Sequence, residues 1–89
     1  MSNPDPFRES EALVAQGHLP AAADVLEQAL ADAKGGAIVA HWLQLAGLRR
    51  ALRQPRRALE AVHGALRLAP LDFMALVMRA SLLERMNDN

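Results

Sequence analysis

The sequence predicts an all-α protein of five helices, and its composition and its helix-end signals carry that prediction. Ala and Leu supply 33 of the 89 residues, whereas Val, Ile and Thr supply six. Unbranched side chains lose little rotamer freedom in a helix, and β-branched ones lose more. No segment alternates apolar and polar residues over the length of a strand. The signals at helix ends place the five helices near residues 6–16, 20–34, 37–52, 55–68 and 73–86.

The first two helices are bounded by capping residues. Asp5 can cap the first helix, with Pro6 at its first position, where the missing N–H costs nothing. Gly17 can end that helix, because glycine accepts a positive φ without strain. Pro20 opens the second helix and Gly35-Gly36 stops it.

Proline also separates the remaining three helices. Gln54-Pro55 ends the third helix and starts the fourth, which ends ahead of Pro70. Asp72 can cap the fifth. Each connection has only two to four residues, so successive helices are expected to be antiparallel neighbours. Residues 1–89 are therefore expected to form one domain.

The chain contains an internal repeat at a spacing of 36 residues. The matched apolar pairs are Ala22 and Ala58, Leu26 and Val62, Ala29 and Ala65, and Leu30 and Leu66. Helix pairs that repeat at this length stack into solenoids, because each pair covers the apolar face of its neighbour.

The second repeat resembles the tetratricopeptide repeat. The residues that carry the resemblance are Trp42, Leu45, Ala46, Ala58, Val62, Ala65 and Pro70, at the offsets of that family. Arg49 stands where the family has an aromatic residue, and Arg53-Gln54-Pro55 replaces the usual Gly-containing turn. The resemblance implies a right-handed α-solenoid of antiparallel helix pairs. It implies repeats at about 3–36 and 39–72, with a half repeat or capping helix at 73–89.

The resemblance also implies a function, namely the binding of a protein partner. In that family the first helices of successive repeats line a concave groove that receives a peptide or a helix. The positions that match the groove are Phe7, Glu11, Val14, Leu43, Gln44, Gly47, Arg50, Met74, Val77, Met78, Ser81 and Arg85. The family members that bind chaperone tails carry Lys, Asn and Arg at set positions, and Phe7, Glu11, Gln44, Met74 and Met78 stand at five of them. We therefore do not expect chaperone tails as ligands.

The last predicted helix is apolar on almost every side, which leaves three interpretations open. Met74, Leu76, Val77, Met78 and Leu82 are too many for one buried stripe. The surplus can bind varied partners, since Met adapts to different surfaces. It can instead be covered by a further helix of a longer protein, or by a second copy in a homodimer.

Charge is balanced over the whole chain but divided between its two halves. Residues 1–36 carry six acids and two bases, and residues 37–89 carry four acids and eight bases. Six arginines lie between 49 and 67. We interpret this run as a solvated turn whose arginine stems lie over apolar surface. The same polarity can attract an acidic partner or a second copy head to tail.

Several function classes are not expected. The chain has no Cys, Thr or Tyr, and Ser occurs only at Ser2, Ser10 and Ser81, so most nucleophilic side chains are missing and no catalytic site is predicted. The three histidines lie 22 or more residues apart, so no metal site is predicted. No cofactor and no small-molecule substrate are expected. Nucleic-acid binding is not expected because only Phe7, Trp42 and Phe73 are aromatic. No apolar run approaches the ~20 residues of a membrane span, and no leader peptide is visible, so a cytoplasmic location is expected.

The main alternative function is a targeting or substrate-recruiting segment at the N-terminus of a larger enzyme. Residues 70–86 are similar to the repeat region that precedes bacterial aspartyl/asparaginyl β-hydroxylase domains. The reading frame beyond Asn89 in the parent gene distinguishes this alternative from a free-standing adaptor.

Overall fold

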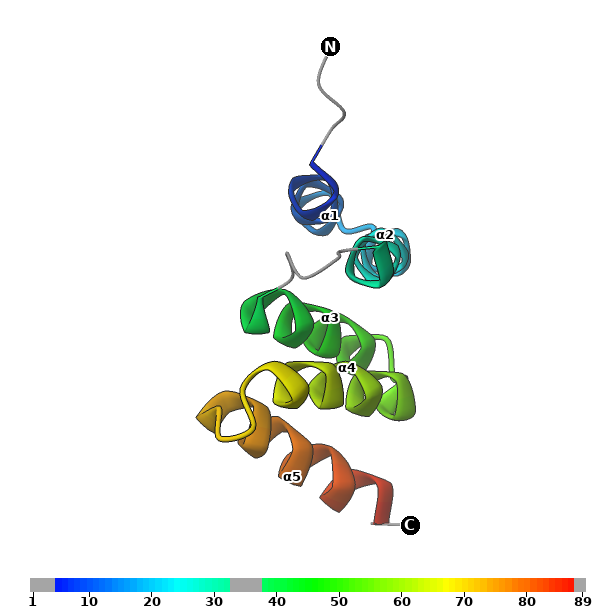
Figure 1. Cartoon of the computed structure of the whole chain (residues 1–89). Helices are drawn as coiled ribbons and strands as arrows, with labels where there is room; N and C mark the ends of the chain where they lie inside the picture. Colours follow the sequence, from blue (N-terminus) through cyan, green and yellow to red (C-terminus); the bar gives the residue numbers. More distant parts are fainter. Residues whose placement is uncertain (1–4, 33–37, 88–89) are drawn as a thin grey trace.

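The computed structural model describes residues 5–32 and 38–87, and the regular structure in these ranges is entirely α-helical (Figure 1). The five helices are α1 (Pro6–Ala15), α2 (Leu19–Asp32), α3 (Val39–Ala51), α4 (Pro55–Leu68) and α5 (Phe73–Asn87). The predicted all-α class is thus confirmed. No helix in the described ranges is both long and apolar enough to cross a membrane.

The capping residues act as the sequence predicts. The Asp5 carboxylate accepts a hydrogen bond from the Phe7 N–H at 3.0 Å, and the Asp72 carboxylate accepts one from the Ala75 N–H at 2.9 Å. Gly17 ends α1 with a φ of +81°. These contacts satisfy backbone groups that have no partner inside a helix.

Several predicted boundaries differ from the structure by one or two residues. Helix α2 begins one residue earlier than expected, at Leu19, and α3 begins two residues later than expected, at Val39. Helices α1 and α3 each end one residue earlier than expected, and α5 ends one residue later. The predicted stop at Gly35-Gly36 lies outside the described residues. Helix ends fray and are the least sharply encoded part of a helix, which accounts for shifts of this size.

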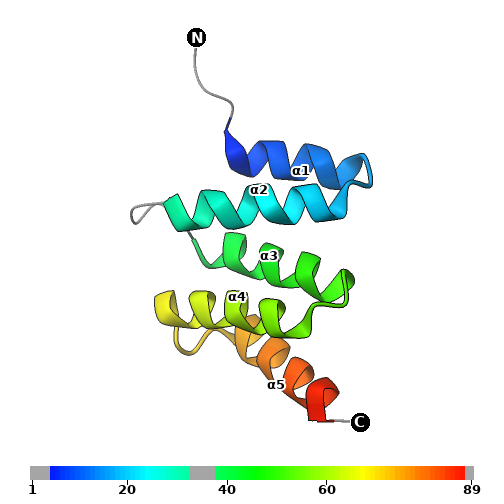
Figure 2. The same cartoon turned by 90° about the vertical axis from the view of Figure 1, so that its right-hand side faces the viewer.

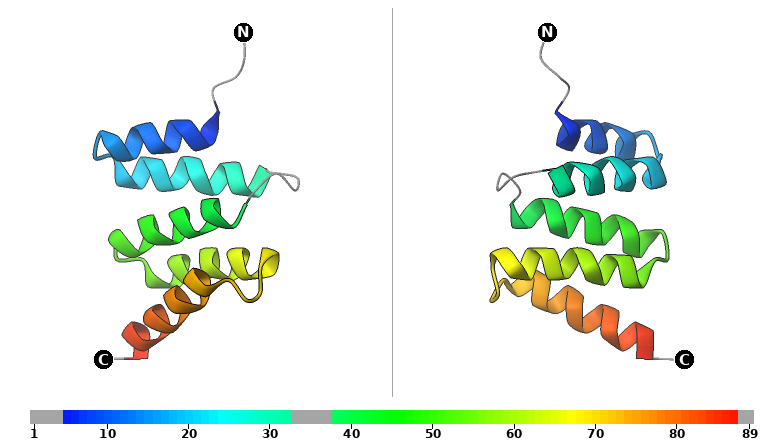
Figure 3. Two further views of the ribbon diagram at one scale, coloured as in Figure 1. Left: turned by 90° about the vertical axis from the view of Figure 1, so that its left-hand side faces the viewer. Right: turned by 45° about the vertical axis from the view of Figure 1, so that its right-hand side comes forward.

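Successive helices lie side by side in chain order, with the N-terminal helix at one end and α5 at the other (Figures 1 and 2). The main packing contacts join α1 to α2, α2 to α3, α3 to α4, and α4 to α5. The result is an elongated body of 48 × 27 × 17 Å. Helix α5 crosses α4 obliquely, whereas α1 and α2 run nearly antiparallel (Figure 3).

Small side chains line the helix contacts. Ala22, Ala46 and Ala58 are fully buried, together with larger residues such as Leu26 and Val62. Alternating small and large side chains lets the helices approach closely and interdigitate. Of the eight residues paired by the 36-residue spacing, seven are buried and Leu66 is half-buried.

The closest approach of α3 and α4 depends on Gly64. A Cβ atom placed on Gly64 would lie 2.6 Å from Cδ2 and Cζ3 of the Trp42 ring, and closer still to Cε3. Because ordinary contacts begin near 3.4 Å, the Trp42 ring packs directly on the backbone of α4. A side chain at position 64 would require the Trp42 ring or the helices themselves to shift.

Arg49 overturns one expectation about the arginine run. The residue is only 2% exposed, so the prediction of a solvated side chain is wrong at this position. Its Nη2 donates to Asp24 at 3.2 Å and Glu27 at 3.1 Å on α2, and its Nη1 donates to Gln54 at 2.9 Å. The two carboxylates of α2 compensate the charge of its planar guanidinium. Arg49 therefore joins α2 to the end of α3.

A second buried polar group joins α1 to α2. The Ser10 hydroxyl is fully buried and donates to the Ala22 carbonyl oxygen at 2.9 Å. A buried hydroxyl without this partner would destabilise the fold, because its desolvation would not be compensated.

Candidate interaction surface

Four of the predicted groove residues form a stripe along α5. Met74 and Val77 are 55% and 45% exposed, Arg85 is exposed and Ser81 is half-buried. Their spacing of three or four residues places them on one helix face. The neighbouring face, formed by Ala75, Met78 and Leu82, is buried in the core. Met78, which was predicted in the groove, thus lies in the core.

The predicted residues of α3 form a second, partly open stripe. Leu43, Gln44 and Gly47 are half-buried and Arg50 is exposed. A Cβ atom on Gly47 would have no other atom within 4 Å, so this position faces open space. The α3 stripe therefore has room for a side chain of a partner.

The residues predicted on α1 are less clearly part of the same surface. Glu11 and Val14 are exposed. Phe7 is half-buried and stacks on His41 of α3, with ring centroids 3.8 Å apart and an interplanar angle of 10°. This stack connects the start of α1 to the start of α3, so part of the Phe7 ring is already occupied by a contact within the chain.

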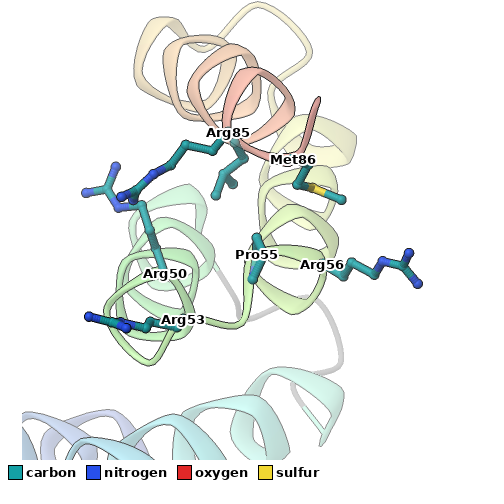
Figure 4. Close-up of a pocket in the computed structure, with 7 residues that line it drawn as sticks. Arg50, Arg53, Pro55, Arg56, Arg85 and Met86 are labelled. Atoms are coloured by element: carbon teal, nitrogen blue, oxygen red, sulfur yellow. The ribbon is translucent and has the colours of Figure 1, made fainter. Parts of the chain in front are cut away.

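The C-terminal ends of the α3 and α5 stripes meet at a basic cavity of about 580 Å³. Arg50 comes from α3 and Arg85 from α5, and in Figure 4 both side chains extend toward the same side of the cavity. The residues that line this cavity are Arg50, Arg53, Pro55, Arg56, Leu82, Arg85 and Met86. Four of the seven are arginines and none is acidic, which focuses a positive potential in the cavity.

Sequence reasoning found two of these arginines and missed the others. Arg50 and Arg85 follow from the groove positions, whereas Arg53 and Arg56 belong to the run that was interpreted only as a solvated turn. The short turn predicted at Gln54-Pro55 could have indicated their position, because it brings Arg53 and Arg56 beside the end of α3. Only the packing of α5 on α4 adds Arg85 to the same cavity.

A second cavity, of about 620 Å³, has the opposite character. It lies between the start of α1 and the second half of α2, and is lined by Pro6, Phe7, Glu9, Asp24, Val25, Gln28, Ala29 and Asp32. Its three carboxylates, Glu9, Asp24 and Asp32, are half of the six acidic residues in the first 36 residues of the chain.

The turn between α3 and α4 carries an unusual backbone conformation. Arg53 has a φ of +59°, in the left-handed region, where a Cβ atom is unfavourable. Its N–H donates to the Arg50 carbonyl oxygen at 3.0 Å, and the Gln54 N–H donates to that of Arg49 at 2.9 Å, so the turn closes α3. Gly17, which has a φ of +81°, is 36 residues earlier and holds the same place in the α1–α2 turn.

The described ranges contain no group of three or more His, Asp or Glu side chains that could hold a metal ion. Comparison of the chain with protein-family models, with curated proteins and with solved structures yields no match. The function must therefore be inferred from the surface.

Proposed function

We propose that this chain is a helical-repeat module that binds a peptide or helix of another protein. The observation that carries the proposal is the exposed apolar stripe of α5. Met74 and Val77 keep about half of their surface in contact with water beside the core face of the same helix. Phe73 and Leu83 are 74% and 41% exposed on the same helix. Apolar surface gathered on one helix is typical of a surface that another protein covers.

The repeat supports the proposal independently of α5. Ala22 and Ala58, and Leu26 and Val62, are 36 residues apart and fully buried. Helices that contact mainly their neighbours in the chain favour a solenoid similar to tetratricopeptide repeats. In this arrangement α3 and α5 are first helices of successive repeats, and their stripes form the two sides of one groove.

Binding requires little rearrangement of the chain. The α3 and α5 stripes lie on helices that the core already fixes, and Gly47 leaves open space between the flanking side chains. A partner then loses its own conformational freedom, but the receiving surface loses little, which favours affinity. A surface with apolar residues beside Gln44, Arg50 and Arg85 suits an amphipathic segment. The same surface would serve a free-standing adaptor or the recruiting segment of a larger enzyme.

A peptide-library selection tests this function. The native chain is used to select binders from a displayed library of random peptides, and the binders are then measured on Met74→Glu and Val77→Glu. We expect each variant to lose binding, because a charge would be buried in an apolar contact. Leu71→Glu is the matched control, since Leu71 is 88% exposed and lies outside the two stripes.

Two outcomes would contradict the proposal. Selected peptides that bind Val77→Glu as tightly as the native chain would place the binding surface elsewhere. Alternatively, light scattering could show a dimer that Val77→Glu converts to a monomer while no library peptide is selected. The α5 stripe would then serve self-association and not a separate partner.

A further inference from the structure

We propose that the basic cavity binds an acidic segment of a partner protein, with carboxylates on its arginines and an aliphatic side chain on its apolar floor. The proposal rests on the function proposed above and names the chemical class of the partner. It also extends the binding surface beyond the α3 and α5 stripes to the turn between α3 and α4.

The first argument is the composition of the cavity wall. Four arginines line one cavity, from α3 (Arg50), the turn (Arg53), α4 (Arg56) and α5 (Arg85). In Figure 4 the side chains of Arg50 and Arg85 extend to the same side, whereas that of Arg56 points away from them. Within the described ranges, the ion pairs formed by arginine all involve Arg49. Like charges held together in this way repel, and an anion that binds among them relieves the repulsion. Guanidinium groups match carboxylates with two parallel hydrogen bonds.

The second argument is the backbone of Arg53. The corresponding residue of the first turn is Gly17, which adopts positive φ without strain. The second turn adopts the same conformation with an arginine, although glycine would be more stable there. Since the turn itself would favour glycine, we infer that arginine occupies position 53 because of its side chain, which lines the cavity.

The cavity distinguishes between classes of anionic partner. Its lining contains no aromatic side chain, so a nucleic acid would find phosphate contacts but no surface for base stacking. Pro55 and Met86, which are half-buried, supply apolar surface between the arginines. That surface fits a Leu-like or Met-like side chain flanked by Asp or Glu. An acidic protein segment can therefore contact both the arginines and the apolar residues, whereas an oligonucleotide would contact only the arginines.

The test measures binding of defined probes by fluorescence anisotropy. The probe is a short labelled peptide that carries Glu-Leu-Glu triplets in a Gly/Ser background, and the comparison probes are the same peptide with Gln for Glu and an oligothymidylate of equal length. We expect the Glu peptide to bind best, and its affinity to fall as salt rises from about 0.05 M to 0.5 M, because salt screens exposed charges.

Two double variants with the same change in net charge locate the site. Arg50→Glu with Arg85→Glu should weaken binding of the Glu peptide by at least about tenfold, because two attractive contacts become repulsive. Arg67→Glu with Arg79→Glu should leave it within about twofold, since both residues are exposed and neither lines the cavity. Arg53→Gly should raise the melting temperature and still weaken binding, which a purely structural role or an unfolded variant would not produce.

Three results would overturn the inference. The Glu and Gln peptides could bind alike or not at all, the two double variants could weaken binding equally, or the oligothymidylate could bind the cavity as well as the Glu peptide. Salt-sensitive self-association that Arg50→Glu with Arg85→Glu abolishes, without peptide binding, would assign the cavity to a second copy. Each result can occur while library peptides still depend on Val77, so failure of this inference is distinguishable from failure of the proposed function.

Discussion

Replacement of glycine by alanine is expected to have opposite effects at two positions of this chain. Gly47 and Gly64 both lie inside helices, where alanine is favoured over glycine by about 1 kcal/mol per residue. At Gly47 the added methyl meets nothing within 4 Å. Gly47→Ala should therefore stabilise the protein by about 1 kcal/mol, which corresponds to a rise of roughly 4–8 °C in the melting temperature of a domain this small.

At Gly64 the same methyl meets the Trp42 ring. Two ring atoms would have to retreat from 2.6 Å to the 3.4 Å at which ordinary contacts begin. Overpacking of this kind costs about 1–3 kcal/mol or more, because helices in a close-packed core cannot shift independently. Gly64→Ala should therefore lower the melting temperature by several degrees in spite of its higher helix propensity.

Thermal unfolding followed by circular dichroism checks both values, and a third substitution tests the cause. In a Trp42→Leu background the ring is absent, so the effect of Gly64→Ala should change sign and become stabilising. The coupling between positions 42 and 64 should reach about 2 kcal/mol. If Gly64→Ala stabilised the native chain as much as Gly47→Ala does, the close packing of α3 on α4 at Trp42 would be refuted.

Three further experiments compare substitutions of buried residues, one of them with an exposed control. Arg49→Met should change the free energy of unfolding, measured in urea, by less than about 1 kcal/mol, because the carboxylate partners of Arg49 are 72% and 51% exposed and remain hydrated without it. A loss above about 3 kcal/mol would contradict this and show that the ion pairs hold α2 on α3. Ala58→Glu should cost several kcal/mol and unfold the chain, whereas Arg56→Glu at the exposed start of α4 should leave the melting temperature nearly unchanged. Equal effects of the two substitutions would contradict the repeat register. Ser10→Ala should lose about 1 kcal/mol in the same urea assay, since one buried hydrogen bond is removed; no loss would mean that this bond contributes nothing to the contact of α1 with α2.

Most of the fold was predictable because the helix ends are encoded locally. Asp5, Gly17 and Asp72 act on the backbone within three residues of themselves, so their role is readable without knowledge of the tertiary structure. The buried alanines followed from the internal repeat. Neither Ala22 nor Ala58 stands out among the many alanines of the chain by itself. Their spacing of 36 residues marked them as equivalent positions, and so as packing positions.

The surface was less predictable because it depends on how helices cross. Helix α5 is apolar around most of its circumference, so periodicity could not tell Met78, which is buried, from Met74, which is not. Arg49 was grouped with its charged neighbours because its two carboxylate partners lie 22 and 25 residues away in the sequence. Arg85 joins the basic cavity through the packing of α5, which no local pattern specifies.

The packing of each helix mainly against its neighbours in the chain has a kinetic consequence. Contacts between segments close in sequence need little loop closure, so such chains cross their folding barrier quickly, typically within microseconds to milliseconds for helical domains. Helices α1 and α5 each have a main packing partner on one side only, whereas α2, α3 and α4 have one on both sides. Amide hydrogens should therefore exchange first in the terminal helices and last in α3 and α4, so that the ends of the stack open while its centre stays folded.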